Sequence, residues 1–126
     1  MVKITSSPNC GNSPKMAFIK EFNIAFAKAD LEFLVESVTD DIVWNIVGDK
    51  RITAKKNFAE ELNKMKSEKP SELLLDQILT HGKEGAANGI IKMQNRKKYA
   101  FSDFYQFKGA KGAKIKSITS YTIKIE

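Results

Sequence analysis

The chain has 126 residues, 42% of them hydrophobic, and a formal net charge of +6 at pH 7. This length accommodates one domain with one core, and the average hydrophobic content excludes a disordered or low-complexity chain. The positive charge comes from lysines dispersed over every segment, without the clustered arginines that nucleic-acid recognition favours, so no nucleic-acid partner is expected.

The sequence contains no signal for a membrane, a metal or a cofactor. Its apolar runs are only a few residues long, and Met1 to Lys15 lacks the apolar region of a secretory signal, so a soluble cytoplasmic protein is expected. Cys10 is the only cysteine and His81 the only histidine, which argues against a disulfide or a metal site. No nucleotide-binding, HExxH or nucleophile-elbow motif is present, so no cofactor is expected.

The first part of the chain predicts two helices after a flexible segment. Residues 1–13 are expected to be flexible, with Cys10 in an exposed loop, and residues 14–126 to form the domain. Ser13 and Pro14 start a helix, because serine caps it and the first helical position does not need the missing N–H of proline. Asp30 can cap a second, shorter helix. Phe18, Phe22 and Phe26 recur on an apolar face of the first helix, opposite Asn23.

The remaining chain predicts one strand, a third helix and four further strands. Residues 42–47 alternate with period two, as in a strand. Thr53 can cap a helix whose Phe58, Leu62 and Met65 share a face. Strands are expected at 73–81, 86–94, 99–108 and 114–125, joined by short loops. Helices separated from a run of strands indicate an α+β fold, with three helices packed on one face of a strongly curved antiparallel or mixed sheet.

The strand at 99–108 has the most regular alternation and contains a candidate functional residue. Asp103 shares its face with four aromatic residues, so it is expected to face the interior, with a pKa raised by desolvation. A carboxylate there must be hydrogen-bonded, neutralised or in use. It either lines a pocket, as a donor, acid or base, or is bonded to a neighbouring hydroxyl, with Thr119 opposite it in a simple register. The four aromatic residues are Tyr99, Phe101, Tyr105 and Phe107.

The chain resembles the nuclear transport factor 2-like superfamily, in its SnoaL-like and ketosteroid-isomerase-like branches. The resemblance is carried by KADL at 28–31, TDDIVW at 39–44 and SDFYQFKG at 102–109, followed by Ile115 and Tyr121. It implies a cone formed by three helices and a bent sheet, with a small-molecule pocket at its open end. It also implies pairing of two copies through the outer face of the sheet.

The resemblance also places the functional positions of ketosteroid isomerases on this chain. Those enzymes use a tyrosine, a protonated aspartic acid and an aspartate base. Phe22 stands at the tyrosine position and Asn45, within one residue, at the base position, whereas Asp103 is retained. Ketosteroid isomerisation by that mechanism is therefore not expected.

The predicted pocket is lined by aromatic residues. Trp44 either covers one wall of it or only fills the core, and its indole N–H needs a partner. His81 is a candidate base if it points inward, and otherwise a solvent-facing residue at a strand end. The residues expected to line the pocket are Phe18, Phe22, Trp44, Phe58, Phe101, Tyr105 and Tyr121.

The opposite face of the last strands predicts self-association. Phe104 and Ile118 are expected to lie opposite one another on the face that the helices leave uncovered, and Ile90 extends this patch. Large apolar residues on an uncovered face indicate a partner surface, so a homodimer is expected.

Three functions remain open at this point. The first is binding of a small apolar or aromatic molecule in the cavity, without catalysis. The second is a cofactor-independent isomerase, cyclase or hydratase that uses Asp103 as general acid or base, with His81 as a possible partner. The third is a scaffolding dimer whose interior is only packing.

Overall fold

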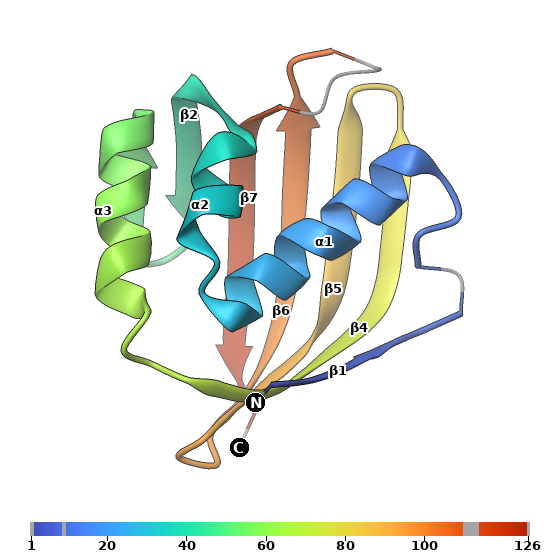
Figure 1. Cartoon of the computed structure of the whole chain (residues 1–126), viewed down its shortest axis with the longest axis vertical. Coiled ribbons are helices and arrows are strands. Elements are labelled where there is room, and N and C mark those ends of the chain that lie inside the picture. Colours follow the sequence, from blue (N-terminus) through green and yellow to red (C-terminus); the bar gives the residue numbers. More distant parts are fainter. Residues whose placement is uncertain (1, 9, 110–113, 126) are drawn as a thin grey trace.

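The computed structural model describes residues 2–8, 10–109 and 114–125. Three helices pack on a mixed sheet of seven strands, which is the predicted α+β class (Figure 1). The elements are β1 (Lys3–Ser6), α1 (Pro14–Lys28), α2 (Leu31–Glu36), β2 (Val38–Ile46), β3 (Lys50–Thr53), α3 (Lys55–Met65), β4 (Pro70–His81), β5 (Glu84–Met93), β6 (Lys98–Phe107) and β7 (Ile115–Lys124).

The sheet has the strand order β1-β4-β5-β6-β7-β2-β3. β1 pairs with β4 and β2 with β7 in parallel, whereas the other neighbours are antiparallel. The sheet curls around the helices without closing, and α1 crosses it diagonally (Figure 1). We call the face that the helices cover the inner face and the opposite one the outer face.

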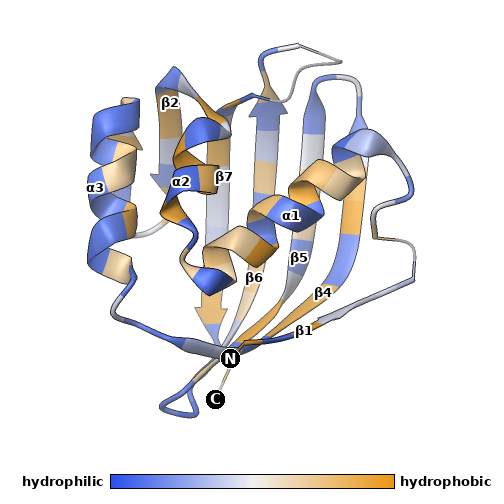
Figure 2. Ribbon diagram, in the orientation of Figure 1, coloured by the Kyte–Doolittle hydropathy of each residue, from blue (hydrophilic) through white to orange (hydrophobic). Residues whose placement is uncertain are grey.

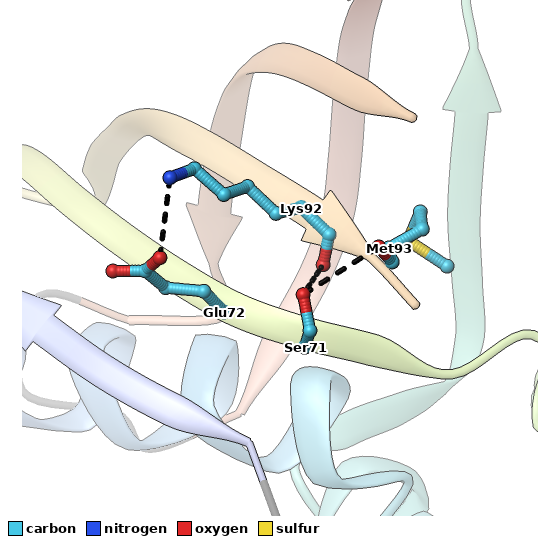
Figure 3. Close-up of polar contacts among 4 residues, drawn as sticks. All are labelled: Ser71, Glu72, Lys92 and Met93. Atoms are coloured by element: carbon cyan, nitrogen blue, oxygen red, sulfur yellow. Dashed lines mark hydrogen bonds and ion pairs between the residues drawn. The ribbon is translucent and has the colours of Figure 1, made fainter. Parts of the chain in front are cut away.

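Two bulges bend β4 and so contribute to the curl. Ser71 and Asp76 are extra residues relative to the register of β5, and such insertions increase the bend and twist of a strand. The hydroxyl of Ser71 contacts the carbonyl oxygens of Lys92 and Met93 at 3.3 and 3.5 Å (Figure 3). Beside it, the Lys92 ammonium lies 3.3 Å from the Glu72 carboxylate. These contacts hold the two strands together where the ladder is interrupted.

The helix starts follow the predicted capping for α1 and α2. The Ser13 side chain accepts a hydrogen bond from the Met16 N–H at 3.2 Å, and Asp30 accepts one from the Phe33 N–H at 3.3 Å. The cap predicted at Thr53 is wrong, because α3 begins after Ala54 and has no side-chain cap. Hydrophobic and hydrophilic residues alternate along all three helices (Figure 2), as expected for elements with one face on the core.

The N-terminal segment differs from the sequence prediction. Residues Lys3–Ser6, expected to be flexible, form β1 along the edge of β4. Cys10, expected in an exposed loop, is buried, with 8% of its surface exposed. Four residues carry too little periodicity to predict a strand, and the pairing that stabilises β1 is with residues about seventy positions away. Part of residues 1–13 therefore pairs with the sheet.

The register between β6 and β7 also differs from the simple one. Phe104 pairs with Thr119, not with Ile118. The shift arises because Lys116 is an extra residue in β7, so that every later residue of the strand points to the face opposite the one predicted. Ile118 is thereby buried on the inner face, with 4% exposure, and Tyr121 lies on the outer face. Residues 110–113 of the connection lie outside the described residues.

Candidate functional site

Asp103 lies on the inner face of β6, as its position in the alternation predicted. It pairs laterally with Ala87 of β5 and Ser120 of β7, both buried. Tyr105, two residues along on the same face, is also buried. Asp103 itself retains part of its solvent exposure. Asp103 therefore belongs to the interior, at a position where the residue is not fully enclosed.

Two chains of hydrogen bonds end at this carboxyl group. In the first, the Asn23 amide of α1 donates to the Tyr105 hydroxyl at 3.0 Å, and that hydroxyl donates to Asp103 Oδ2 at 3.4 Å. In the second, the Trp44 indole N–H donates to Ser120 Oγ at 3.0 Å, and the Ser120 hydroxyl is bonded to Asp103. Elements α1, β2, β6 and β7 thus converge on one carboxyl.

Burial controls the protonation of this site. Desolvation raises the pKa of Asp103 from its ordinary 3.8 to about 6, although the hydrogen bonds from Ser120 and Tyr105 act in the opposite direction. The pKa of Tyr105 is raised well above 10, first by burial and then by the negative charge of Asp103. Asp103 is therefore the group of the pair that changes charge near neutral pH.

The inner face becomes more exposed from one end of the sheet to the other. Along β6, Phe107 and Tyr105 are buried, whereas Asp103 and Phe101 are partly exposed. Along β7 the inner residue Thr122, which pairs with Phe101, is exposed, and so is Lys124, which pairs with Tyr99. This end lies at the bottom of Figure 1, beyond the helices. We call the inner surface at Phe101 and Thr122 the open end, and Asp103 lies at its inner limit.

Four of the predicted pocket residues pack in or against the core, as two contacting pairs. Phe22 and Phe58 are buried, and Phe58 lies 5.5 Å from Trp44 between ring centroids. Phe18 is partly exposed and contacts Phe22 and Phe107 at 6.5 and 5.9 Å. Ser120 provides the partner that the Trp44 N–H needs. These side chains form the core behind Asp103, whereas Phe101 and Tyr105 are next to Asp103 on its own strand.

Two predicted site residues lie away from Asp103. Tyr121, expected in the pocket, is on the outer face, where its ring lies 6.1 Å from that of Phe104 in an edge-on arrangement. His81 is exposed at the end of β4 and lines a hollow of about 420 Å³ on the outer face with Leu79, Glu84 and other residues. Of the two placements considered for His81, the structure therefore has the solvent-facing one at a strand end and not the inward one.

The outer face carries exposed apolar side chains. Phe104 is 52% exposed and Ile123, near the end of β7, is 67% exposed; Figure 2 shows hydrophobic colour at this end of β7. Leu79 and Tyr121 are exposed on the same face. Ile90 also points outward but is partly buried. We call Leu79, Phe104, Tyr121 and Ile123 the outer patch; Ile118, predicted to be at its centre, is not part of it.

Asn23 and Ser120 belong to the site although sequence reasoning missed them. Asn23 was predicted to be on the polar side of the first helix, yet it is buried and also donates to the Ile19 carbonyl at 2.9 Å. Its position four residues after Ile19 was an available signal, because such residues share a face. Ser120 could not be found without knowledge of the bulge at Lys116.

Residues 2–8, 10–109 and 114–125 contain no group of three or more histidine, cysteine, aspartate or glutamate side chains placed to hold a metal ion. In the same residues, no helix is long and apolar enough to cross a membrane.

The side chains that ketosteroid isomerase chemistry requires are only partly present at the positions that the resemblance assigns. Phe22 has no hydroxyl, and its ring packs edge-on against Tyr105 at 6.0 Å. Asn45 lies on the outer face, paired with Thr119, whereas its neighbour Trp44 points inward. Asp103 is the one position of the three that carries an ionisable group on the inner face.

No family model and no curated protein matches the sequence. Solved structures do match. A nuclear transport factor 2-like protein of unknown function from Cytophaga hutchinsonii is 23% identical, with a TM-score of 0.66, over 85% of this chain and 97% of that one. A putative ketosteroid isomerase from Kribbella flavida is 11% identical, with a TM-score of 0.74, over 87% and 78%.

An LEH-like epoxide hydrolase from M. tuberculosis is 17% identical, with a TM-score of 0.71, over 85% of this chain and 80% of that one. At these identities the likeness concerns the fold, which accommodates proteins of different activities. The chain has the fold of the nuclear transport factor 2-like superfamily.

Proposed function

We propose that this protein binds a small, largely apolar molecule at the open end of the inner face, with Asp103 contacting the polar group of that molecule. The observation that carries the proposal is the position of Asp103 at the point where the inner face changes from buried to exposed. Apolar surface with a few placed polar groups is the usual composition of a small-molecule site.

The cost of keeping Asp103 in place supports a binding role. A carboxyl at this position loses water, and four side chains are arranged to compensate for that loss. A sheet that needed only packing would be more stable with an apolar residue there. Phe101 and Thr122 then supply the surface against which the body of the ligand lies.

Fluorescence of phenylnaphthylamine, an uncharged apolar probe, tests the proposal. We expect saturable binding with one probe per chain, and at least a tenfold loss of affinity in Phe101→Asp, because the charge is placed at the open end. The matched control is Phe104→Asp, three residues away on the outer face, which should bind normally. Equal loss in both variants, or loss in Phe104→Asp alone, would locate the probe elsewhere and refute the proposal.

A second candidate function is cofactor-independent acid–base catalysis of the isomerase, cyclase or hydratase kind. It is favoured by one observation, the pKa of about 6 for Asp103, because an acid or base works best when its pKa is near the working pH. The Kribbella neighbour is named a putative isomerase, whereas the M. tuberculosis neighbour is named an epoxide hydrolase. Asp103 would act alone as proton carrier, with Tyr105 and Ser120 orienting it.

Measuring substrate turnover distinguishes binding without catalysis from acid–base catalysis. If Asp103 is catalytic, Asp103→Asn should still bind a substrate but lose at least a hundredfold in kcat. The wild-type rate should change with an apparent pKa near 6. A compound that is turned over equally by both proteins would exclude Asp103 as the acid or base.

We also propose that two copies of the chain associate through the outer patch. The patch joins large apolar side chains on one uncovered face, and a two-fold arrangement would cover each patch with its own copy. Sedimentation should give a dimer for the wild type at micromolar concentration and a folded monomer for Phe104→Lys. Phe104→Leu, which keeps the apolar surface, should remain dimeric. A monomeric wild type would refute this proposal.

A further inference from the structure

The hydrogen-bond directions around Asp103 are determined by groups that can act in only one way. The Trp44 indole nitrogen is a donor and never an acceptor. The Asn23 nitrogen contacts two oxygens, the Ile19 carbonyl at 2.9 Å and the Tyr105 hydroxyl at 3.0 Å. Because the Ile19 carbonyl can only accept, the amide group must place its N–H₂ and not its oxygen at this point.

These two fixed donors orient the hydroxyl groups that follow them. Ser120 accepts the indole N–H and Tyr105 accepts the amide N–H, so each hydroxyl proton is free to point toward Asp103. Two lone pairs of the carboxylate are thereby occupied, out of about four that a carboxylate offers. About two lone pairs remain, and Asp103 is a partly exposed residue that lies next to Phe101, at the open end, on the inner face.

We infer that the polar group of the bound molecule is a hydrogen-bond donor, such as an alcohol or an amine, because both donor chains end at the Asp103 carboxylate and leave it as the acceptor for the ligand. This inference rests on the proposed binding function and adds the class of ligand to it. A ligand that presents only a carbonyl or carboxylate oxygen would meet lone pairs and negative charge.

Among the described residues, the side chains that flank or reach Asp103 carry no further charge; Lys124, on the same face, is four residues beyond Ser120 at the end of β7. Ala87 of β5 and Ser120 of β7 flank it, Asn23 of α1 and Trp44 of β2 reach it through the two hydroxyls, and Tyr105 is the titratable neighbour. Tyr105 stays neutral because its pKa is raised well above 10. Selectivity for donors should therefore follow the titration of Asp103 alone.

A pair of compounds with the same carbon skeleton tests the inference. Methyl naphthyl ketone can only accept a hydrogen bond, whereas the secondary alcohol formed from it by reduction can also donate. By isothermal titration at about pH 7.5, we expect the alcohol to bind about tenfold more tightly, as for a hydrogen bond to a charged group. At about pH 5 the ratio should fall, because a protonated Asp103 can donate to the ketone.

Two variants test whether the ratio of alcohol affinity to ketone affinity depends on Asp103. Asp103→Asn offers both an N–H₂ and an oxygen, so the ratio should fall below threefold and lose its pH dependence. Asp76→Asn, which removes an exposed carboxylate of β4, should keep both the wild-type affinity ratio and its pH dependence. Equal binding of ketone and alcohol to the wild type, with NMR shifts at Phe101, would overturn this inference and leave the binding function standing. If neither the ketone nor the alcohol bound, both the inference and the proposed binding function would be overturned.

Discussion

Asp103 and Phe104 are consecutive residues of β6, and they point to opposite faces of the same sheet. Asp103 faces the core, where its carboxyl is desolvated, and Phe104 faces outward, with 52% of its surface exposed. Their lateral partners follow the same division, with Ala87 and Ser120 beside Asp103 and Thr119 beside Phe104. A sheet that served only its own stability would place the two residues the other way round.

Burying the Asp103 carboxyl and exposing the Phe104 ring both cost stability, and the two faces differ in how the chain offsets that cost. On the inner face, Tyr105 and Ser120 donate to the carboxyl, so part of the desolvation is offset. On the outer face, the described compensation for Phe104 is one edge-on contact with Tyr121, worth roughly 1 kcal/mol. The inner arrangement is completed by hydrogen bonds within one chain, whereas the outer arrangement leaves apolar side chains exposed.

The largest expected effect is on the pH dependence of stability. The pKa of Asp103 is raised on folding, so its contribution to the free energy of unfolding is fully present below pH 3.8 and is lost as pH rises through about 6. The loss amounts to at most about 3 kcal/mol. Urea unfolding at several pH values should therefore show a steeper fall for the wild type than for Asp103→Asn.

Other carboxylates titrate over the same range, so the difference between variants is the informative quantity. Asp76→Asn, exposed on β4, should follow the wild-type curve. If the free energies of unfolding of wild type and Asp103→Asn changed in parallel from about pH 4 to pH 7, the Asp103 carboxyl would be solvated. The proposed contrast between a desolvated Asp103 and an exposed Phe104 would then be wrong.

The second effect concerns two asparagines that make the same local contact. Asn23 and Asn57 each donate to the carbonyl four residues earlier, at 2.9 and 2.8 Å, but Asn23 is buried and Asn57 exposed. Asn23→Ala should cost about 2 kcal/mol, because it also leaves the Tyr105 hydroxyl without a donor. Asn57→Ala should cost less than about 0.5 kcal/mol. Equal losses in urea unfolding would mean that the Tyr105 contact contributes nothing.

The third effect compares two serines of β7 on opposite faces. Ser120 accepts the Trp44 N–H on the inner face, and Ser117 donates to Gln106 at 3.1 Å on the outer face. Ser120→Ala leaves a buried indole N–H unpaired, so it should cost about 1.5 kcal/mol. Because Ser120 also lowers the pKa of Asp103, its removal should move that pKa upward in an NMR titration. Ser117→Ala should change neither quantity.

The sequence was sufficient to predict that Asp103 faces the interior, because the alternation of β6 is regular. The alternation of β6 from Tyr99 to Phe107 continues without interruption, because the extra residue lies in β7, so period two placed Asp103 and Phe104 on the correct faces. The core of helices and strands followed from apolar spacing in the same way. Local periodicity is sufficient where the backbone stays regular.

The parts that were wrong depend on departures from regularity or on distant pairing. The extra Lys116 reversed the faces of Ile118 and Tyr121, and no local signal in β7 announces it. Asn23 is polar on a buried helix position because Tyr105, far along the chain, needs a donor. A polar residue of that kind becomes recognisable only when its partner is known.

The smallest expected effect on the folded monomer is at Phe104. Because it is half exposed and contacts Tyr121 only edge-on, Phe104→Thr should lower the free energy of unfolding by less than about 1 kcal/mol in dilute solution. Threonine keeps the β propensity of the position. If two copies pair through the outer patch, the wild-type melting temperature must rise with protein concentration, because association stabilises only the folded chain. The melting temperature of Phe104→Thr should be independent of concentration over the same range. If the wild-type melting temperature were also independent of protein concentration, the proposal that a second copy covers the outer patch would be refuted.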